Sequence, residues 1–209
     1  MKSVSVLYRR ALPMAFRSHR RYLLFAGVLF SACIVIGYRG YSGSGDSLPW
    51  VFASLVRLKD SMATASPGRR ILILFWNNFR VTLISVGLGW LLGLVPLVSL
   101  ALNGVIIGVG VRSMMLRSGA SLPAVAASFA AHGLFELPAF VAGQAVGIRI
   151  GFLTPLAWRG KGGAPDLGRA VAEGVTILVL FVVPLLALAA VLELEVSPAV
   201  LRMAAPVLK

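Results

Sequence analysis

Two uncharged apolar runs in this sequence are long enough to cross a lipid bilayer, and they lie at Tyr22–Tyr38 and Gly174–Leu192. A bilayer core about 30 Å thick needs roughly 20 apolar residues per helix, and only helices or closed barrels satisfy their backbone there. The whole chain is 58% hydrophobic and 13% charged, which is about half the charged share of a soluble domain. We therefore expect an all-α, polytopic transmembrane helix bundle of about five spans.

Positive charge is in excess and lies beside the apolar runs. The chain has 20 Lys and Arg against 7 Asp and Glu, for a formal net charge of +13. No basic stripe is interleaved with aromatic residues, as a nucleic-acid surface would require. Arginines next to membrane spans attract anionic lipid head groups and set the topology. We expect membrane lipids, including anionic head groups, as partners, and no nucleic acid.

The chain opens with a basic segment followed by its first span. Residues 1–21 hold six Lys and Arg and no acidic residue. Dense positive charge stays on the cytoplasmic side, so we expect a cytoplasmic N-terminus and a span over residues 22–38, in a multi-pass protein of the cell membrane. A cleaved signal peptide is the alternative, but no A-x-A cleavage site follows the run.

The remainder divides into a polar loop, a membrane core and a tail. Within the loop, residues 39–70, apolar residues recur at helical spacing, which predicts an amphipathic helix at the membrane interface; a solvated helix packed on the domain is the alternative. Residues 71–192 are the expected transmembrane core, and residues 193–209 the tail.

Inside the core, we expect a span over Val81–Leu102 that ends in a tight turn at Asn103-Gly104, because glycine adopts positive φ without penalty. The next apolar stretch, residues 104–116, is short. It either forms a thin third span or is re-entrant, since non-helical backbone is tolerated at depth only where protein or water covers it.

Glu136 is an acidic residue at membrane depth, and His132 lies one helical turn before it, on the same helix face. Four interpretations are open: a buried hydrogen-bonded pair, a proton or ion relay, a metal site, and acid–base catalysis. The set is poor for a metal, because no third intramembrane ligand accompanies it. It is also poor for catalysis, because no nucleophile or second carboxylate does. We expect no catalytic residue, no metal and no cofactor.

Pro138 and a set of small residues describe how this segment packs. Pro138 removes a backbone donor, which predicts a kink or break near Leu134. Small residues then recur at every fourth position and form one stripe, Ala139, Gly143, Gly147 and Gly151. Such a stripe lets another helix approach closely. Gly89 with Gly93, and Gly104 with Gly108, form shorter versions, so we expect packing within the chain first, with a second copy or another protein as the alternative.

Four motifs follow one another through the core. They are Phe75-Trp76-Asn77-Asn78; the glycines 87, 89 and 93; Asn103-Gly104 with Gly108; and His132-Gly133 followed by Glu136-Leu137-Pro138-Ala139. Their order and spacing, from about Phe75 to Gly151, resemble the stage II sporulation protein M family. Ala131 departs from the pattern, because the family usually has Pro before the His. Asn77 and Asn78 either cap a helix end or form hydrogen bonds across helices to His132 or Glu136.

The resemblance implies a five-span fold with a cytoplasmic N-terminus. In endospore-forming bacteria the family member anchors two peptidoglycan hydrolases at the engulfing septal membrane. By this likeness we expect a non-enzymatic membrane scaffold that anchors or recruits envelope or membrane-remodelling partners through its helix faces and polar loops, or binds a second copy through its small-residue helix faces. The alternative is a small transporter or channel centred on His132 and Glu136, because a broken helix beside an intramembrane acid is typical of transporter sites.

The expected orientation is testable by labelling. In a Cys33→Ala background, a cysteine at Ser5 should resist a membrane-impermeant maleimide in intact cells and react after permeabilisation, because the acid-free basic segment stays inside. Labelling of Ser5→Cys from outside intact cells would reverse the assigned topology.

Overall fold

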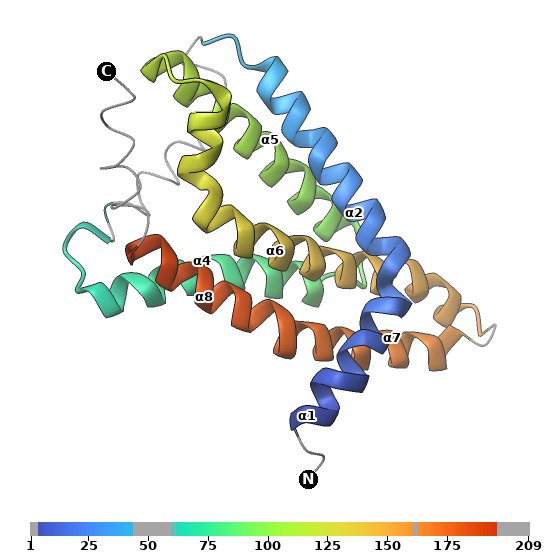
Figure 1. Cartoon of the computed structure of the whole chain (residues 1–209). Helices are drawn as coiled ribbons and strands as arrows, with labels where there is room; N and C mark the ends of the chain where they lie inside the picture. The colour runs from blue at the N-terminus through green and yellow to red at the C-terminus, as the bar shows by residue number, and fades with distance from the viewer. Residues whose placement is uncertain (1–3, 44–59, 61, 161–162, 196–209) are drawn as a thin grey trace.

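The computed structural model describes residues 4–43, 60, 62–160 and 163–195. Figure 1 shows a bundle of long helices. Two continuous helical segments of the bundle, called rods below, each contain a π-helical turn. The first rod comprises α1 (Val4–Val6), the turn Leu7–Ala11 and α2 (Leu12–Gly40). The middle helices are α4 (Pro67–Gly87), α5 (Leu94–Ser118) and α6 (Leu122–Trp158). The last rod comprises α7 (Gly163–Ile177), the turn Leu178–Val182 and α8 (Val183–Glu195).

Within the described residues, four helical stretches are long and apolar enough to cross a membrane. They are Leu7–Gly40, Leu94–Ser118, Gly133–Trp158 and Ala164–Leu192. α4 has 21 residues, about 31 Å at 1.5 Å per residue, and it packs against α6 and α8 (Figure 1). The predicted all-α transmembrane bundle is therefore confirmed, with α4 as a further long helix in the same bundle.

α6 is the central helix, and within its C-terminal half the stretch 139–151 is buried on nearly every side. One apolar cluster joins this half to α2, α7 and α8 through residues such as Val146, Ile177 and Leu186. A second cluster joins it to α2 and α5 through residues such as Phe30 and Leu100. Consecutive positions from 142 to 148 are all buried, so every face of this stretch has a neighbouring helix.

Pro138 bends α6 without breaking it. The helix is continuous from Leu122 to Trp158 and contains Pro138 in its interior. Figure 1 shows the N-terminal part of α6, in yellow, running in a different direction from the gold C-terminal part. A proline removes one hydrogen bond and tilts the axis while the rest of the ladder continues. The predicted kink is present, and the alternative of a broken helix is not.

The predicted turn at Asn103-Gly104 is wrong. Both residues lie in the middle of α5, so Val81–Leu102 is not one span, and residues 104–116 form neither a separate span nor a re-entrant segment. The chain instead turns between α4 and α5, where Leu92 has φ 55° and Gly93 has φ 72°. The absence of a Cβ at Gly104 serves helix packing rather than a positive φ.

Gly104 and Gly108 bring α5 into backbone contact with α2. A Cβ added at Gly104 would lie 2.7 Å from the Cβ of Cys33 and 2.9 Å from the carbonyl oxygen of Phe30. At Gly108 it would overlap the carbonyl oxygen of Ile34 and lie 2.6 Å from a second α2 backbone atom. Only glycine allows such an approach, which gives close van der Waals contact where lipid supplies no hydrophobic drive.

The stripe on α6 packs in the same way against α4 and the turn after it. A Cβ at Gly143 would overlap the Thr82 side chain, and one at Gly147 would lie 3.0 Å from the carbonyl oxygen of Ser85. A Cβ at Gly151 would overlap the backbone of Gly93. The stripe therefore packs against a helix of the same chain.

The basic segment is helical over its described residues and continues into α2 without interruption. Ala15 and His19 are already buried there, so contact with the bundle begins before residue 22. The predicted amphipathic helix within residues 39–70 falls mostly on residues 44–59 and 61, and the tail mostly on residues 196–209. Both lie outside the described residues.

Two glycines on α5 form a matched pair for testing the close contact. Gly108→Ala should destabilise the protein by about 1–3 kcal/mol, because the new methyl group overlaps α2. Gly110→Ala should be neutral or stabilising by up to about 1 kcal/mol, because nothing lies within 4 Å of its Cβ position. Thermal melts in detergent measure both, and equal melting temperatures for the two variants would contradict the packing.

Candidate functional site

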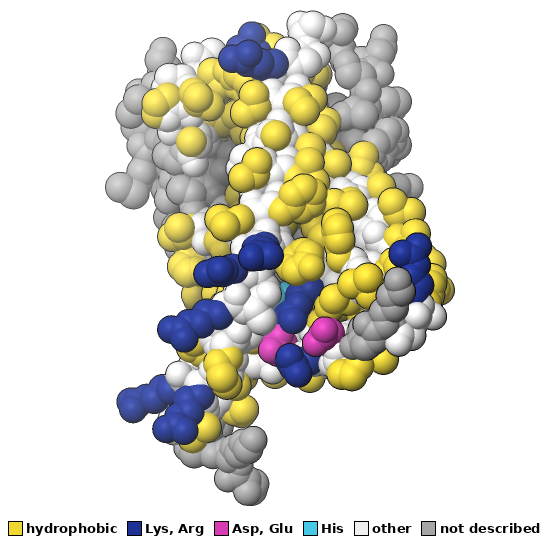
Figure 2. Space-filling view, turned by 90° about the vertical axis from the view of Figure 1, so that its right-hand side faces the viewer, with side chains coloured by type: hydrophobic (Ala, Val, Ile, Leu, Met, Phe, Trp, Pro, Cys, Tyr) yellow, Lys and Arg dark blue, Asp and Glu magenta, His cyan; other side chains and the backbone are white. Residues whose placement is uncertain are grey.

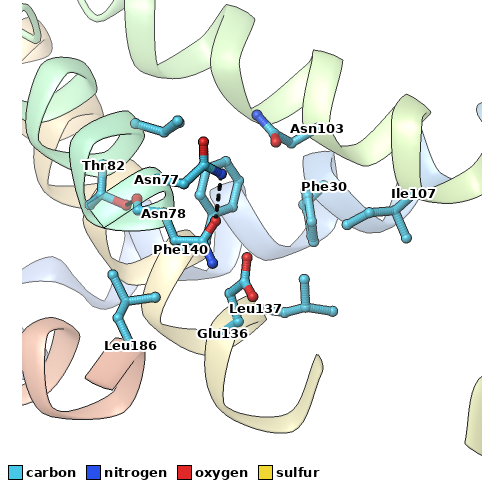
Figure 3. A pocket seen from close by; sticks show the side chains of 11 residues that line it. Phe30, Asn77, Asn78, Thr82, Asn103, Ile107, Glu136, Leu137, Phe140 and Leu186 are labelled. Atoms are coloured by element: carbon cyan, nitrogen blue, oxygen red, sulfur yellow. Dashed lines mark hydrogen bonds between the residues drawn. The ribbon is translucent and has the colours of Figure 1, made fainter. Parts of the chain in front are cut away.

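A cavity of about 80 Å³ lies between α4, α5 and α6 (Figure 3). Its polar lining comes from three helices, with Asn77 and Asn78 on α4, Asn103 on α5 and Glu136 on α6. Together with His132, whose side chain lies outside the described residues, these are the polar residues that the sequence motifs single out, and they lie on segments far apart in the chain. The fold thus brings the motif residues of three separate helices to one place.

Asn77 and Asn78 lie in the interior of α4, ten or more residues after its start at Pro67. They therefore do not cap the helix, and the capping interpretation is wrong. The amide nitrogen of Asn77 donates to the side-chain oxygen of Asn78 at 3.3 Å. One turn later, the Thr82 hydroxyl donates to the backbone carbonyl of Asn78 at 3.2 Å. The side-chain amides of Asn77 and Asn78 therefore line the cavity from α4, and the Thr82 hydroxyl is hydrogen-bonded within α4.

Asn103 faces the cavity from α5. Its amide nitrogen donates to the carbonyl oxygen of Ser99 at 2.7 Å, within the same helix. A carbonyl can only accept, so this bond fixes which end of the amide is nitrogen. The side-chain oxygen of Asn103 is therefore the end left available for other contacts. Figure 3 shows this side chain on the α5 side of the cavity, across from Glu136.

Glu136 extends from α6 toward the amides of α4, as Figure 3 shows. The residue is half-buried, and one of its carboxylate oxygens, Oε2, is shielded from solvent. The side chain of His132 lies outside the described residues, so its pairing with Glu136 stays a prediction. Gly133 follows on the same helix and, like Pro138, supplies no side chain to the cavity lining.

The cavity combines a polar side with apolar walls. The walls include Phe30, Ile107, Leu137, Phe140 and Leu186. One water molecule needs about 10–15 Å³ of such volume, so 80 Å³ accommodates several waters or a small ion with its waters. Within the described residues no group of three or more His, Cys, Asp or Glu could hold a metal ion.

A second polar cluster, which none of the sequence motifs includes, joins α2, α6 and α7. Nη1 of Arg149 lies 2.6 Å from Oε2 of Glu173, and the Ser18 hydroxyl donates to the same oxygen at 2.5 Å. His19 is fully buried beside them, and its Nδ1 donates to the carbonyl oxygen of Ala15 at 2.8 Å. The cluster ties the start of α2 to the bundle.

Sequence signals for this cluster exist but are weak. Arg149 is a charged residue within the segment that carries the small-residue stripe, and Glu173 directly precedes the last apolar run. Opposite charges that each border an apolar run are candidates for pairing. Nothing in the spacing, however, shows that Ser18 and His19 lie on the helix between them.

This arrangement of long apolar helices around a polar cavity defines a polytopic helical membrane protein. The family model for Stage II sporulation protein M matches residues 22–198. The chain therefore belongs to the stage II sporulation protein M family, and the resemblance carried by its motifs is confirmed. No curated protein and no solved structure matches the chain.

Two carboxylates on α7 provide a test of the second cluster. Glu173→Gln should destabilise the protein by about 1–3 kcal/mol, because Arg149 loses its counter-charge; the Arg149 side chain is only 11% exposed. Asp166→Asn should change stability by less than about 0.5 kcal/mol, since its pair with Arg169 spans 3.7 Å and both side chains are exposed. Thermal melts compare the two, and a silent Glu173→Gln would show that the cluster does not hold α2 in place.

Proposed function

We propose that this protein is a non-enzymatic membrane scaffold that anchors or recruits envelope or membrane-remodelling partners. The observation that supports this proposal is a basic helical arm, defined as residues 4–21. Figure 1 shows the N-terminal end of the first rod extending past the other helices. Family membership agrees with an anchoring role, since the resemblance implies one.

The arm has a charged side and a packed side. Its arginines are exposed to solvent, namely Arg9, Arg10, Arg17, Arg20 and Arg21. Leu12 and Phe16 pack against the apolar cluster that includes Ala15. Figure 2 shows dark blue side chains along the lower part of one face, below a largely apolar region. Each such charge near an anionic leaflet contributes about 1 kcal/mol to binding, so the arm suits lipid head groups and acidic partner segments.

The small-residue faces are occupied within the chain. Gly104 and Gly108 contact α2, and Gly143, Gly147 and Gly151 contact α4 or the turn after it. We therefore assign partner contacts to the arm rather than to these faces.

A small transporter or channel is the second candidate, and the cavity that reaches Glu136 is the observation that favours it. Against it stands the tight α4–α6 contact at Gly143, Gly147 and Gly151. A path along that interface would require the two backbones to separate. The scaffold remains the better supported proposal, because a static anchor needs no such movement.

Partner capture with arm variants tests the scaffold. Protein carrying Gln at Arg9, Arg10 and Arg17 should recover its envelope partners from native membranes about a hundredfold less well, because three charges at roughly 1 kcal/mol each sum to about 3 kcal/mol. A control with Gln at Arg39, Arg69 and Arg117, which are exposed elsewhere, should behave like the parent. Labelling of Ser5→Cys in each variant verifies that topology is unchanged. Equal recovery by arm and control variants would reject the arm as the docking surface.

Glu136→Gln separates the two candidates. In a scaffold the amide keeps the shape and an acceptor, so partner capture should be retained. In a transporter an amide cannot titrate, so a flux measured in liposomes should disappear from a normally folded variant. A parental flux that is lost in Glu136→Gln would favour transport over the scaffold.

A further inference from the structure

An apolar groove of about 410 Å³ lies between α4 and α5. It borders the polar cavity at Val81 and is much larger than that cavity. Apart from two serines, the residues that line the groove are apolar. The groove opens to the outside of the bundle, because Ile84 of α4 and Leu94 and Val98 of α5 are each about half exposed.

The groove exists because α4 and α5 diverge. Each of them packs against α6, but they contact one another little, and Figure 1 shows them running in different directions. Two helices that diverge from one end leave a wedge between them. In a bilayer, acyl chains are as apolar as leucine side chains, so a lipid tail fits an apolar wedge that is open to the membrane.

Arg80 places a positive charge at the end of the groove that lies away from the turn between α4 and α5. Along α4, Arg80 comes directly before the groove residues, and the turn comes after them. Arg80 is exposed and lies one helical turn before Ile84, on the same face of α4. No ion pair joins it to an acid within the described residues, and the groove lining has no acid.

A phosphate group fits this charge. An arginine beside an apolar membrane surface is costly unless its guanidinium reaches water or an anion. The guanidinium binds phosphate oxygens through paired hydrogen bonds. A phospholipid carries both groups that suit the site, an anionic phosphate for Arg80 and an apolar tail for the groove.

We propose that the groove between α4 and α5 binds one acyl chain of an anionic phospholipid, with the lipid phosphate on Arg80. The order of groups along α4 agrees with the orientation of a lipid in a bilayer. Arg69 and Arg70 lie at the start of α4, and basic residues mark a membrane surface. The phosphate would lie toward that surface, and the tail would run from Arg80 toward the turn.

This site goes beyond the scaffold proposal and does not depend on it. It lies on α4 and α5, whereas the basic arm belongs to the first rod, and a lipid can fill the groove without any protein partner. Its test uses purified protein and defined lipids, so a failure here leaves the test of partner capture unaffected.

The experiment uses the purified full chain in phosphatidylcholine liposomes with a small fraction of phosphatidylglycerol that carries a photoreactive diazirine in one acyl chain. Irradiation should attach this probe mainly to groove residues of α5 between Leu94 and Leu102, and peptide mass spectrometry locates the adducts. Labelling should saturate, and unlabelled phosphatidylglycerol should displace the probe. The same diazirine chain on phosphatidylcholine should label the groove less, because that lipid has no net negative charge.

Two pairs of variants test the head group and the tail separately. Arg80→Gln should need about fivefold more probe for half-maximal labelling, the change expected when one charge near an anionic head group is lost. Arg117→Gln, which is exposed in the last turn of α5, should label like the parent. Val98→Phe should abolish the saturable adducts, because the added ring fills the groove, whereas Val28→Phe, at an exposed position on α2, should not.

Three outcomes would overturn the proposal. They are adducts spread evenly over the exposed helix faces, equal groove labelling by the two probes, and parental labelling in Arg80→Gln. A cross-link between two copies of the chain through the groove, without lipid adducts there, would assign the groove to a second copy and also overturn it. If thermal melts show that Arg80→Gln does not fold, Val98→Phe and Val28→Phe decide the question in the same assay.

Discussion

In lipid, helices gain little by hiding apolar side chains from one another, so close contact between backbones must supply much of the packing energy. Gly104 and Gly108 let α5 meet α2, and the α6 stripe from Gly143 to Gly151 lets α4 meet α6. α6 takes part in both apolar clusters. Its position fixes where Glu136 lies, because the acid is one turn before the stripe begins. The polar cavity is thus a consequence of glycine-mediated contact along one helix.

Much of the fold could be predicted from the sequence, because lipid imposes simple rules on length and polarity. Long apolar runs predict the helical bundle, and small residues at every fourth position predict the stripe on α6. The turn was predicted at the wrong glycine, because the sequence alone does not show which glycines adopt a positive φ. Gly104 allows close packing against α2, whereas Gly93 adopts the positive φ of the turn. The two roles can be distinguished only when the neighbouring helices are known.

The candidate site was predictable in its parts but not in its assembly. The sequence identifies Glu136 as an acid at membrane depth, where a charge is costly without a role. It marks Asn77 and Asn103 only as motif residues, at the entry to the membrane and at a predicted turn. Their convergence depends on the rotation and depth of three helices, which one sequence does not specify. The cluster of Ser18 and Glu173 was missed for the same reason, since 155 positions separate the two residues.

That separation also has a consequence for biogenesis. A chain emerges from the ribosome N-terminus first, and its segments fold in that order. The segment that carries Ser18 is synthesised long before Glu173, so α2 is inserted before the carboxylate that will hold it exists. The contact that ties the basic arm to the bundle therefore forms only after α7 has been synthesised. Shortened products that end before α7 lack that tether.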